Sequence, residues 1–377
     1  MPAFAFRHIE NLYSVFWDKS VEMTDAIIKS IQNNARGSKT VDIQEWASRA
    51  TLDIIGTAGM GQDFTAIQDP TSQLTQIYRT IFSSTKGGRL LNLTTLLVPQ
   101  WLIRIFSPKR HAEYEKSLMA IKRITHNLIH SKRAMLEKGT KMDVDILSVA
   151  IGSGGFGDEE LVDQMMNFLA AGHETTASAI SWATYLLCRH PKAQKKLREE
   201  LLTSSSAITD PAMSISSKAI ARLPYLNAVL NETLRLFPSI PILLREADHD
   251  STIQGHFIPK GTTVIICPWA INTSKALWGD DALDFRPERW LKPGEANAGG
   301  AGTNYANGTF SHGPRSCIGK EFSKAEFACL LAALISRFEI ECENDTPKVH
   351  DGFLSASPKG GMMLKLTPVA GSLEAGN

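Results

Sequence analysis

A single cysteine, Cys317, stands between two glycines in the stretch FSHGPRSCIG, residues 310–319, just before a predicted helix. The thiolate is the form of cysteine that binds a metal, and free backbone N–H groups at a helix start stabilise negative charge. Gly313 and Gly319 would let the backbone wrap closely around the sulfur. The sequence therefore predicts a metal-binding thiolate. The alternatives are a reactive cysteine without a metal and a plain core cysteine.

The residues around this cysteine indicate which metal group would fit. No second cysteine stands beside Cys317, which favours a group that supplies its other metal bonds itself, and haem is such a group. Arg315 would present a fixed positive charge that suits a carboxylate, for example a porphyrin propionate. Phe310 would pack beside the loop. We therefore predict a haem-binding loop.

A second candidate site lies in AGHETT, within the long and mostly apolar stretch 159–189. HETTA begins like the zinc motif HExxH, but Ala177 occupies the place of the second histidine, which excludes that zinc site. Glu174 and Thr175 would cost desolvation in such a helix unless a site uses them. With Gly172 they predict a local distortion where a ligand approaches the backbone. The alternative is an exposed polar stripe on one helix face.

A third pattern is ETLR, which places Glu232 and Arg235 on one helical face. Such pairs are common on exposed helices, but the flanking residues here are apolar, which favours a buried pair. Buried charges must be paired and hydrogen-bonded. Arg289, in FRPERW, is the candidate for a further partner.

The stretch GSGGFG, residues 152–157, matches the dinucleotide-binding pattern GxGxxG, and Glu174 lies roughly where a ribose-binding acid would stand. The preceding DILSVAI spaces its apolar residues like a short helix, and no strand-helix-strand pattern surrounds the glycines. We therefore favour a loop between two helices over a dinucleotide site.

The elements that must position these residues are mostly helical. Residues 1–205 show apolar residues at helical spacing, residues 159–189 predict one long helix through the middle of a domain, and a helix follows Cys317. Short β-branched runs between 243 and 272 predict small strands, and the tail predicts a short hairpin. No internal repeat or linker divides the chain. The expected architecture is one mainly α domain with minor β structure.

Composition excludes several classes of protein. The chain has 377 residues with a net charge of +1, which gives no support to nucleic-acid binding. Five cysteines without a CxxC pair make a disulfide framework unexpected and favour a reducing compartment. No apolar run approaches the ~18 residues of a membrane span, which leaves surface association with a membrane open.

Taken in order, AGHETT, ETLR, FRPERW and FSHGPRSCIG resemble the cytochrome P-450 superfamily of haem-thiolate monooxygenases. The last stretch matches the family pattern F-x-x-G-x-R-x-C-x-G at every fixed position. The resemblance covers roughly residue 159 to the C-terminus and implies the cytochrome P-450 fold, a helical prism with small sheets. Two departures stand out. Trp290 ends the FRPERW motif where the family has phenylalanine, and the family is longer ahead of the long helix, so the resemblance implies a single domain over 1–377 whose N-terminal part is missing.

The resemblance also assigns roles by matched position. Cys317 would be the axial thiolate of haem b, and Glu174 with Thr175 would relay protons to bound dioxygen. Glu232, Arg235 and Arg289 would form a buried network. The haem-binding residues would be Arg245, in PSIPILLREA, Phe310, Gly313, Arg315, Cys317 and Gly319.

The function implied by the resemblance is insertion of one oxygen atom from O2 into a hydrophobic small molecule, with electrons from an NADPH-dependent reductase and a role in secondary metabolism. The family also implies the cytosolic face of the endoplasmic reticulum membrane, or the cytosol if the anchor is genuinely absent. The alternative is a non-catalytic haem-binding remnant.

Overall fold

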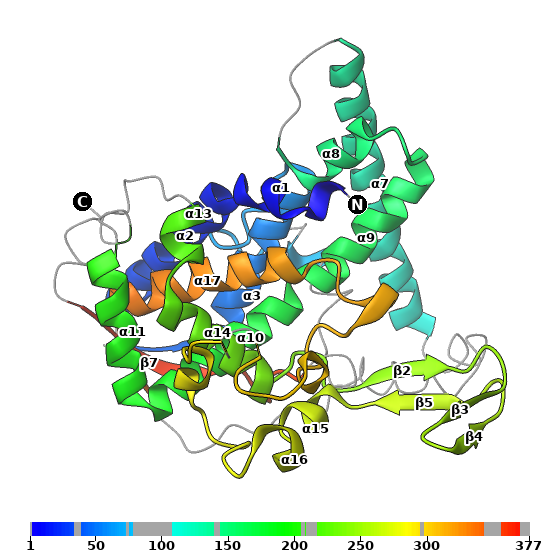
Figure 1. Cartoon of the computed structure of the whole chain (residues 1–377). Helices are drawn as coiled ribbons and strands as arrows, with labels where there is room; N and C mark the ends of the chain where they lie inside the picture. Colours follow the sequence, from blue (N-terminus) through cyan, green and yellow to red (C-terminus); the bar gives the residue numbers. More distant parts are fainter. Residues whose placement is uncertain are drawn as a thin grey trace.

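The computed structural model describes residues 2–33, 39–72, 75–77, 108–138, 144–204, 208, 217–294, 298–342 and 356–369. Figure 1 shows a helical body with two small strand pairs at one end. The α-helices are α1 (Phe6–Glu10), α2 (Tyr13–Gln32), α3 (Ile43–Ile54), α7 (Pro108–Glu137), α8 (Ile146–Gly152), α9 (Asp158–Gly172), α10 (Glu174–Arg189), α11 (Pro191–Ser204), α13 (Ser217–Ala221), α14 (Pro224–Leu236), α15 (Pro268–Asn272), α16 (Lys275–Trp278) and α17 (Lys320–Arg337). Short turns of other helix types are η1 (Pro2–Phe4), η2 (Ile55–Met60), η3 (Pro287–Trp290), η4 (Asn304–Ala306) and η5 (Gly313–Arg315).

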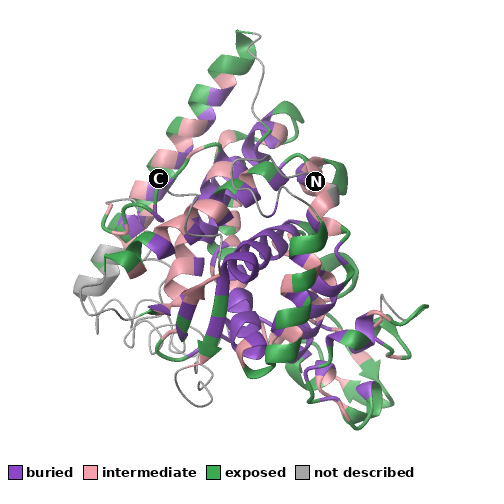
Figure 2. Ribbon diagram, turned by 90° about the vertical axis from the view of Figure 1, so that its left-hand side faces the viewer, coloured by how far each residue is buried: buried purple, intermediate pink, exposed green. Residues whose placement is uncertain are grey.

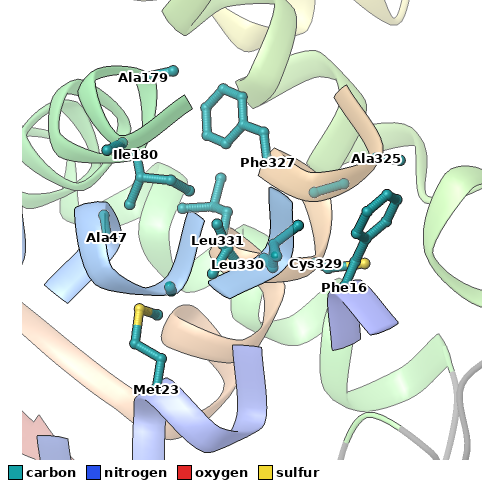
Figure 3. Close-up of a cluster of buried hydrophobic side chains, with 14 of the residues drawn as sticks. Phe16, Met23, Ala47, Ala179, Ile180, Ala325, Phe327, Cys329, Leu330 and Leu331 are labelled. Atoms are coloured by element: carbon teal, nitrogen blue, oxygen red, sulfur yellow. The ribbon is translucent and has the colours of Figure 1, made fainter. Parts of the chain in front are cut away.

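The core forms where α17 passes between α2 and α10, and α3 packs against α10. Helix α17 begins directly after the cysteine loop and is buried from Ala325 to its end. Figure 2 shows that the helices at the centre of the molecule are buried. Figure 3 shows apolar side chains from these helices in one cluster, among them Phe16, Ile180 and Phe327. Phe16 lies edge-on to Phe322, with ring centroids 4.9 Å apart. Burial of apolar surface at about 25 cal/mol per Å² stabilises this arrangement and fixes the helix that carries the cysteine loop.

Three small antiparallel sheets complete the described fold. Strands β2 (Leu243–Glu246) and β5 (Thr263–Ile266) pair, as do β3 (Ser251–Ile253) and β4 (His256–Ile258). The third sheet has the order β1-β7-β6, from β1 (Thr40–Asp42), β7 (Met363–Pro368) and β6 (Phe338–Cys342). The expected strands between 243 and 272 are confirmed up to Ile266, after which α15 follows. At the tail, β6 and β7 pair antiparallel, but residues 343–362 separate them and β7 also pairs with β1, so the expected short hairpin is part of a three-stranded sheet. The expectation that residues 1–205 are helical is wrong at β1, because a partner more than 300 residues away supplies its hydrogen bonds.

Two further expectations about the helices can be compared with the structure. The loop GSGGFG joins α8 to α9, and no strand precedes it, so the helix-loop interpretation is confirmed. The single helix expected over 159–189 is wrong, because the chain forms α9 and α10 with a break at His173. The carbonyl of His173 accepts a hydrogen bond from Thr51 Oγ1 at 3.0 Å, so a contact with α3 stabilises the break.

A disulfide joins Cys188, near the end of α10, to Cys342, at the end of β6. The sequence made a disulfide framework unexpected, and this single bridge is not a framework. The cysteines are 154 residues apart in the chain, and only tertiary folding brings their Cα atoms to 5.7 Å. Among the described helices, none is both long and apolar enough to cross a bilayer.

Candidate functional site

The cysteine loop, residues 310–319, contains η5 and ends where α17 begins, and the Cys317 side chain in it is exposed. The loop is closed by a hydrogen bond of 2.8 Å from the Cys317 N–H to the Phe310 carbonyl. Gly313 has a φ of +75° in the left-handed region, and no atom lies within 4 Å of where a Cβ would stand. That conformation favours glycine. The sharp turn therefore follows from the sequence and presents the thiol outward.

The local electrostatics of Cys317 differ in part from the sequence expectation. The backbone N–H of Gly319 acts on the thiol in the expected direction and lowers its pKa, but desolvation by the surrounding loop is larger, so the pKa of Cys317 is raised overall. The expected stabilisation of the thiolate by a backbone N–H at the helix start is present, but burial of the thiol opposes it. Metal binding would favour the ionised sulfur, because it displaces the thiol proton.

The chemistry of the donor set fits haem. The Cys317 sulfur is exposed, the space beside Gly313 in the same loop is open, and the described residues contain no group of three or more His, Cys, Asp or Glu side chains that could enclose a bare metal ion. A single protein ligand suits a group whose ring nitrogens supply the other metal bonds. Arg315, in η5, and Arg245, on β2, are both exposed, so their guanidinium groups are accessible to a carboxylate.

Helix α14 carries a fully buried carboxylate, Glu232. Arg235, one turn later, donates to it from Nε at 2.9 Å and from Nη2 at 2.8 Å. Arg289 Nε and the backbone N–H of Arg286 each donate at 2.9 Å. Glu232 and Arg235 both have an exposed fraction of 0% and Arg289 has 6%. The structure thus brings together the three residues that the sequence singled out, and the network satisfies the charges as burial requires.

A further partner of this carboxylate was missed by the sequence reasoning. Trp290 Nε1 donates to Glu232 Oε2 at 2.9 Å. The signal was the tryptophan at the position where the family pattern has phenylalanine, since only tryptophan carries an indole N–H donor. Trp278 packs nearby, with Arg235 4.9 Å from its ring centroid. We refer below to Glu232, Arg235, Arg289 and Trp290 as the Glu232 network.

The break between α9 and α10 positions Glu174 and Thr175. Thr175 Oγ1 donates to the Ala171 carbonyl at 2.9 Å, and the Thr175 carbonyl accepts from Ser239 Oγ at 2.7 Å. Burial raises the pKa of Glu174 to about 7. The expected local distortion is present, and it holds a carboxyl group that exchanges a proton near neutral pH.

A second carboxyl group that the sequence reasoning did not single out is Glu326 on α17. Its exposed fraction is 0%, and burial raises its pKa well above the usual value. The sequence feature that could have indicated this residue is a glutamate inside the otherwise apolar run AEFACLLAALI. Burial therefore favours the neutral form of this carboxyl group on α17, which packs against α10.

Comparison with known proteins supports one family. The family model described as Cytochrome P450 matches residues 1–366. The chain is 46% identical over 379 residues to the cytochrome P450 monooxygenase sphH of Aspergillus fumigatus, an alignment that covers 98% of this chain and 69% of the relative. It is 39% identical to the cytochrome P450 monooxygenase FUM15 of Gibberella moniliformis, with 98% and 70% covered. For the cytochrome P450 monooxygenase ALT8 of Alternaria alternata, the identity is 37%, with 98% and 72% covered.

Proposed function

The chain belongs to the cytochrome P450 family, and from this premise we propose that it uses a haem held by Cys317 to insert one oxygen atom of O2 into a hydrophobic small molecule. The single observation that carries the proposal is the exposed thiol at the turn before α17, with no other metal-binding cluster in the part of the chain that the structure describes. The relatives named above are monooxygenases, so the chain is an oxidoreductase of the same kind. Their names give no support to the alternative of a non-catalytic remnant.

The proposal gives each part of the loop a task. Cys317 would hold the haem iron through its sulfur, to which the N–H of Gly319 hydrogen-bonds. Gly313 gives the turn, and Phe310 packs against the core beside it. When haem is bound, it supplies the redox chemistry of dioxygen, and thiolate ligation favours cleavage of the O–O bond.

Arg315 and Arg245 would pair with the two propionates of the haem. Both side chains are exposed, and each guanidinium offers a fork of N–H donors that matches a carboxylate. Arg245 Nη1 already donates to the Leu244 carbonyl at 2.8 Å, which leaves its other donors for a ligand.

Protons would pass through Glu174 and Thr175. Because the pKa of Glu174 is about 7, its carboxyl group can both give and regain a proton at neutral pH. The Thr175 hydroxyl, held against the Ala171 carbonyl, is the adjacent donor that can pass this proton on. The apolar length of α10 behind them excludes water, which protects the proton for the reaction.

The wider setting of the enzyme follows from the family. We expect a single haem-binding domain over 1–377, electrons from an NADPH-dependent reductase, and a substrate from fungal secondary metabolism, because the relatives named above are fungal. We further expect the cytosolic face of the endoplasmic reticulum membrane, the location that the family resemblance implies.

Replacement of the ligand tests the proposal. Purified chain expressed with haem precursors should give, after reduction and addition of carbon monoxide, the long-wavelength Soret band typical of thiolate ligation. Cys317→Ser should abolish this band, because a hydroxyl does not replace a thiolate. Cys267→Ser is the matched control, since Cys267 is also a free cysteine but lies at the start of α15. A wild-type protein without the band, or a Cys317→Ser variant that retains it, would refute the proposal.

A further inference from the structure

We propose that Asn272, the last residue of α15, is a positioning residue that ties the segment leading into the cysteine loop to the Glu232 network. The inference rests on the proposed function, because it concerns how Cys317 is held for iron. Neither the sequence motifs nor the family resemblance singled out this asparagine. Its contacts on both sides carry the argument.

The side chain of Asn272 is fully buried, with an exposed fraction of 0%, and uses both ends of its amide. Its Oδ1 accepts from the backbone N–H of Gly308 at 2.7 Å, and its Nδ2 donates to Thr309 Oγ1 at 2.8 Å. Its own carbonyl accepts from Arg235 Nη1 at 2.8 Å. Asn272 therefore contacts Arg235 of the Glu232 network through its backbone carbonyl. Its side chain contacts residues 308 and 309, which lead into the cysteine loop.

A second hydrogen bond connects the same segment to α14. Thr309 Oγ1, which accepts from Asn272, donates to the Leu234 carbonyl on α14 at 2.8 Å. Leu234 is adjacent in the chain to Arg235, so Thr309 and Asn272 both return to the same turn of α14. Gly308 is pressed against α15, because a Cβ there would lie 3.3 Å from Pro268 Cα. The segment 308–309 is thus fixed on two sides.

From this fixed segment, backbone hydrogen bonds lead directly to the ligand. The N–H of Ser311 donates to the Gly308 carbonyl at 2.9 Å, and the N–H of Cys317 donates to the Phe310 carbonyl at 2.8 Å. The cysteine loop is therefore hydrogen-bonded to Gly308, which Asn272 contacts, and is closed at Phe310, which follows Thr309 in the chain. Displacement of Gly308 would displace the base of the loop, and metal geometry is sensitive to such outer contacts.

The chemistry of the site requires an amide. The Gly308 N–H requires a hydrogen-bond acceptor. The Thr309 hydroxyl donates its proton to the Leu234 carbonyl, so its oxygen can only accept from a donor. A single side chain that meets both groups must therefore carry an acceptor and a donor. Leucine fills a similar volume and offers neither, and it would leave the buried Gly308 N–H unsatisfied. Asn272→Leu therefore removes the positioning contacts while the backbone contact with Arg235 is retained.

The test compares Asn272→Leu with Asn227→Leu in the haem-loaded chain. Asn227 is the control, because its side chain also makes two hydrogen bonds, from Nδ2 to the carbonyls of Ala221 and Leu223, but at the N-terminal end of α14 and not to the segment 308–309. The readout is the fraction of the reduced carbon monoxide complex with the thiolate-type Soret band, measured at urea concentrations where both variants remain folded. We expect a loss of roughly 10-fold or more for Asn272→Leu and no loss for Asn227→Leu.

A milder pair keeps the inference testable if Asn272→Leu fails to fold. Thr309→Val removes the hydroxyl but leaves the Gly308 N–H paired, so we expect a partial loss of the same band. Thr273→Val is its control, since Thr273 Oγ1 donates only to the Trp269 carbonyl. Equal thiolate fractions in Thr309→Val and Thr273→Val would overturn the inference. A wild-type chain that lacks the band would instead refute the proposed function.

Discussion

The indole of Trp290 gives a quantitative test of the Glu232 network. Trp290→Phe keeps an aromatic ring in place and removes the N–H that donates to Glu232 Oε2 at 2.9 Å. A hydrogen bond to a charged group contributes about 1.5–3 kcal/mol, and the partner here is wholly buried. The two guanidinium groups still neutralise Glu232 in this variant, so the loss should remain in that range, with an added packing cost for the smaller ring.

Trp278→Phe is the matched control for this substitution. Trp278 is buried to a similar degree, with 6% exposed against 5% for Trp290, and its Nε1 donates at 3.2 Å to a neutral acceptor, the Ala306 carbonyl. A neutral hydrogen bond contributes about 0.5–1.5 kcal/mol, while the lost ring volume is the same. Trp290→Phe should therefore cost about 1 kcal/mol more than Trp278→Phe in the free energy of unfolding.

The assay is equilibrium urea unfolding of the haem-loaded chain, followed by far-UV circular dichroism. The pair should also be measured in a Glu232→Gln background, where the charge is gone. In that background, Trp290→Phe and Trp278→Phe should lower the free energy of unfolding by more nearly equal amounts, because the acceptor of the Trp290 hydrogen bond is no longer an anion. A Trp290→Phe cost equal to or below that of Trp278→Phe in the wild-type background would refute the reasoning.

Three further predictions concern proton transfer, pH and packing. Glu174→Gln should slow substrate oxidation by about 10²-fold, measured as the rate of product formation, while leaving the thiolate-type Soret band unchanged; an unchanged rate would remove Glu174 from the proton path. Burial raises the pKa of Asp53 from 3.8 to about 6, so the folded state holds its proton more tightly and stability should fall as pH rises through this range. At about 1.4 kcal/mol per pKa unit, wild type should lose up to about 3 kcal/mol relative to Asp53→Asn between these pH values in urea titrations, and parallel curves would contradict the assignment. Gly56→Ala would place a Cβ 2.6 Å from the Gln62 carbonyl oxygen, and should cost about 1–3 kcal/mol, whereas Gly59→Ala, 3.3 Å from a flexible side chain, should cost less; thermal unfolding that ranks them in the opposite order would argue against this packing.

Much of the candidate site was predictable because its residues are close together in sequence. Cys317, Gly313 and Gly319 belong to one turn and the helix that follows it, so local backbone preferences already fix how the sulfur is presented. Glu232 and Arg235 are one helical turn apart, and their apolar flanks indicated burial. The short strands at 243–266 and the helix after the cysteine also follow from local periodicity.

The remaining features depend on partners that are distant in sequence, and only tertiary structure decided them. Strand β1 exists because β7 pairs with it, and the disulfide exists because folding brings Cys188 to Cys342. The break at His173 is stabilised by a hydrogen bond from Thr51 on another helix. No local pattern encodes such contacts, because a side chain becomes a hydrogen-bond partner only when folding brings the second group within about 3 Å.

The contrast is sharpest within the cysteine segment itself. The sequence alone determined that position 317 carries a thiol on a tight turn before a helix, since glycine, proline and helix-start preferences act over a few residues. Only the folded chain decided the anchoring of that turn, through Asn272 and Thr309, and the desolvation that raises the pKa of the thiol. Both effects arise from atoms that surround the loop in space, and burial is a property of the whole packed structure rather than of any short segment.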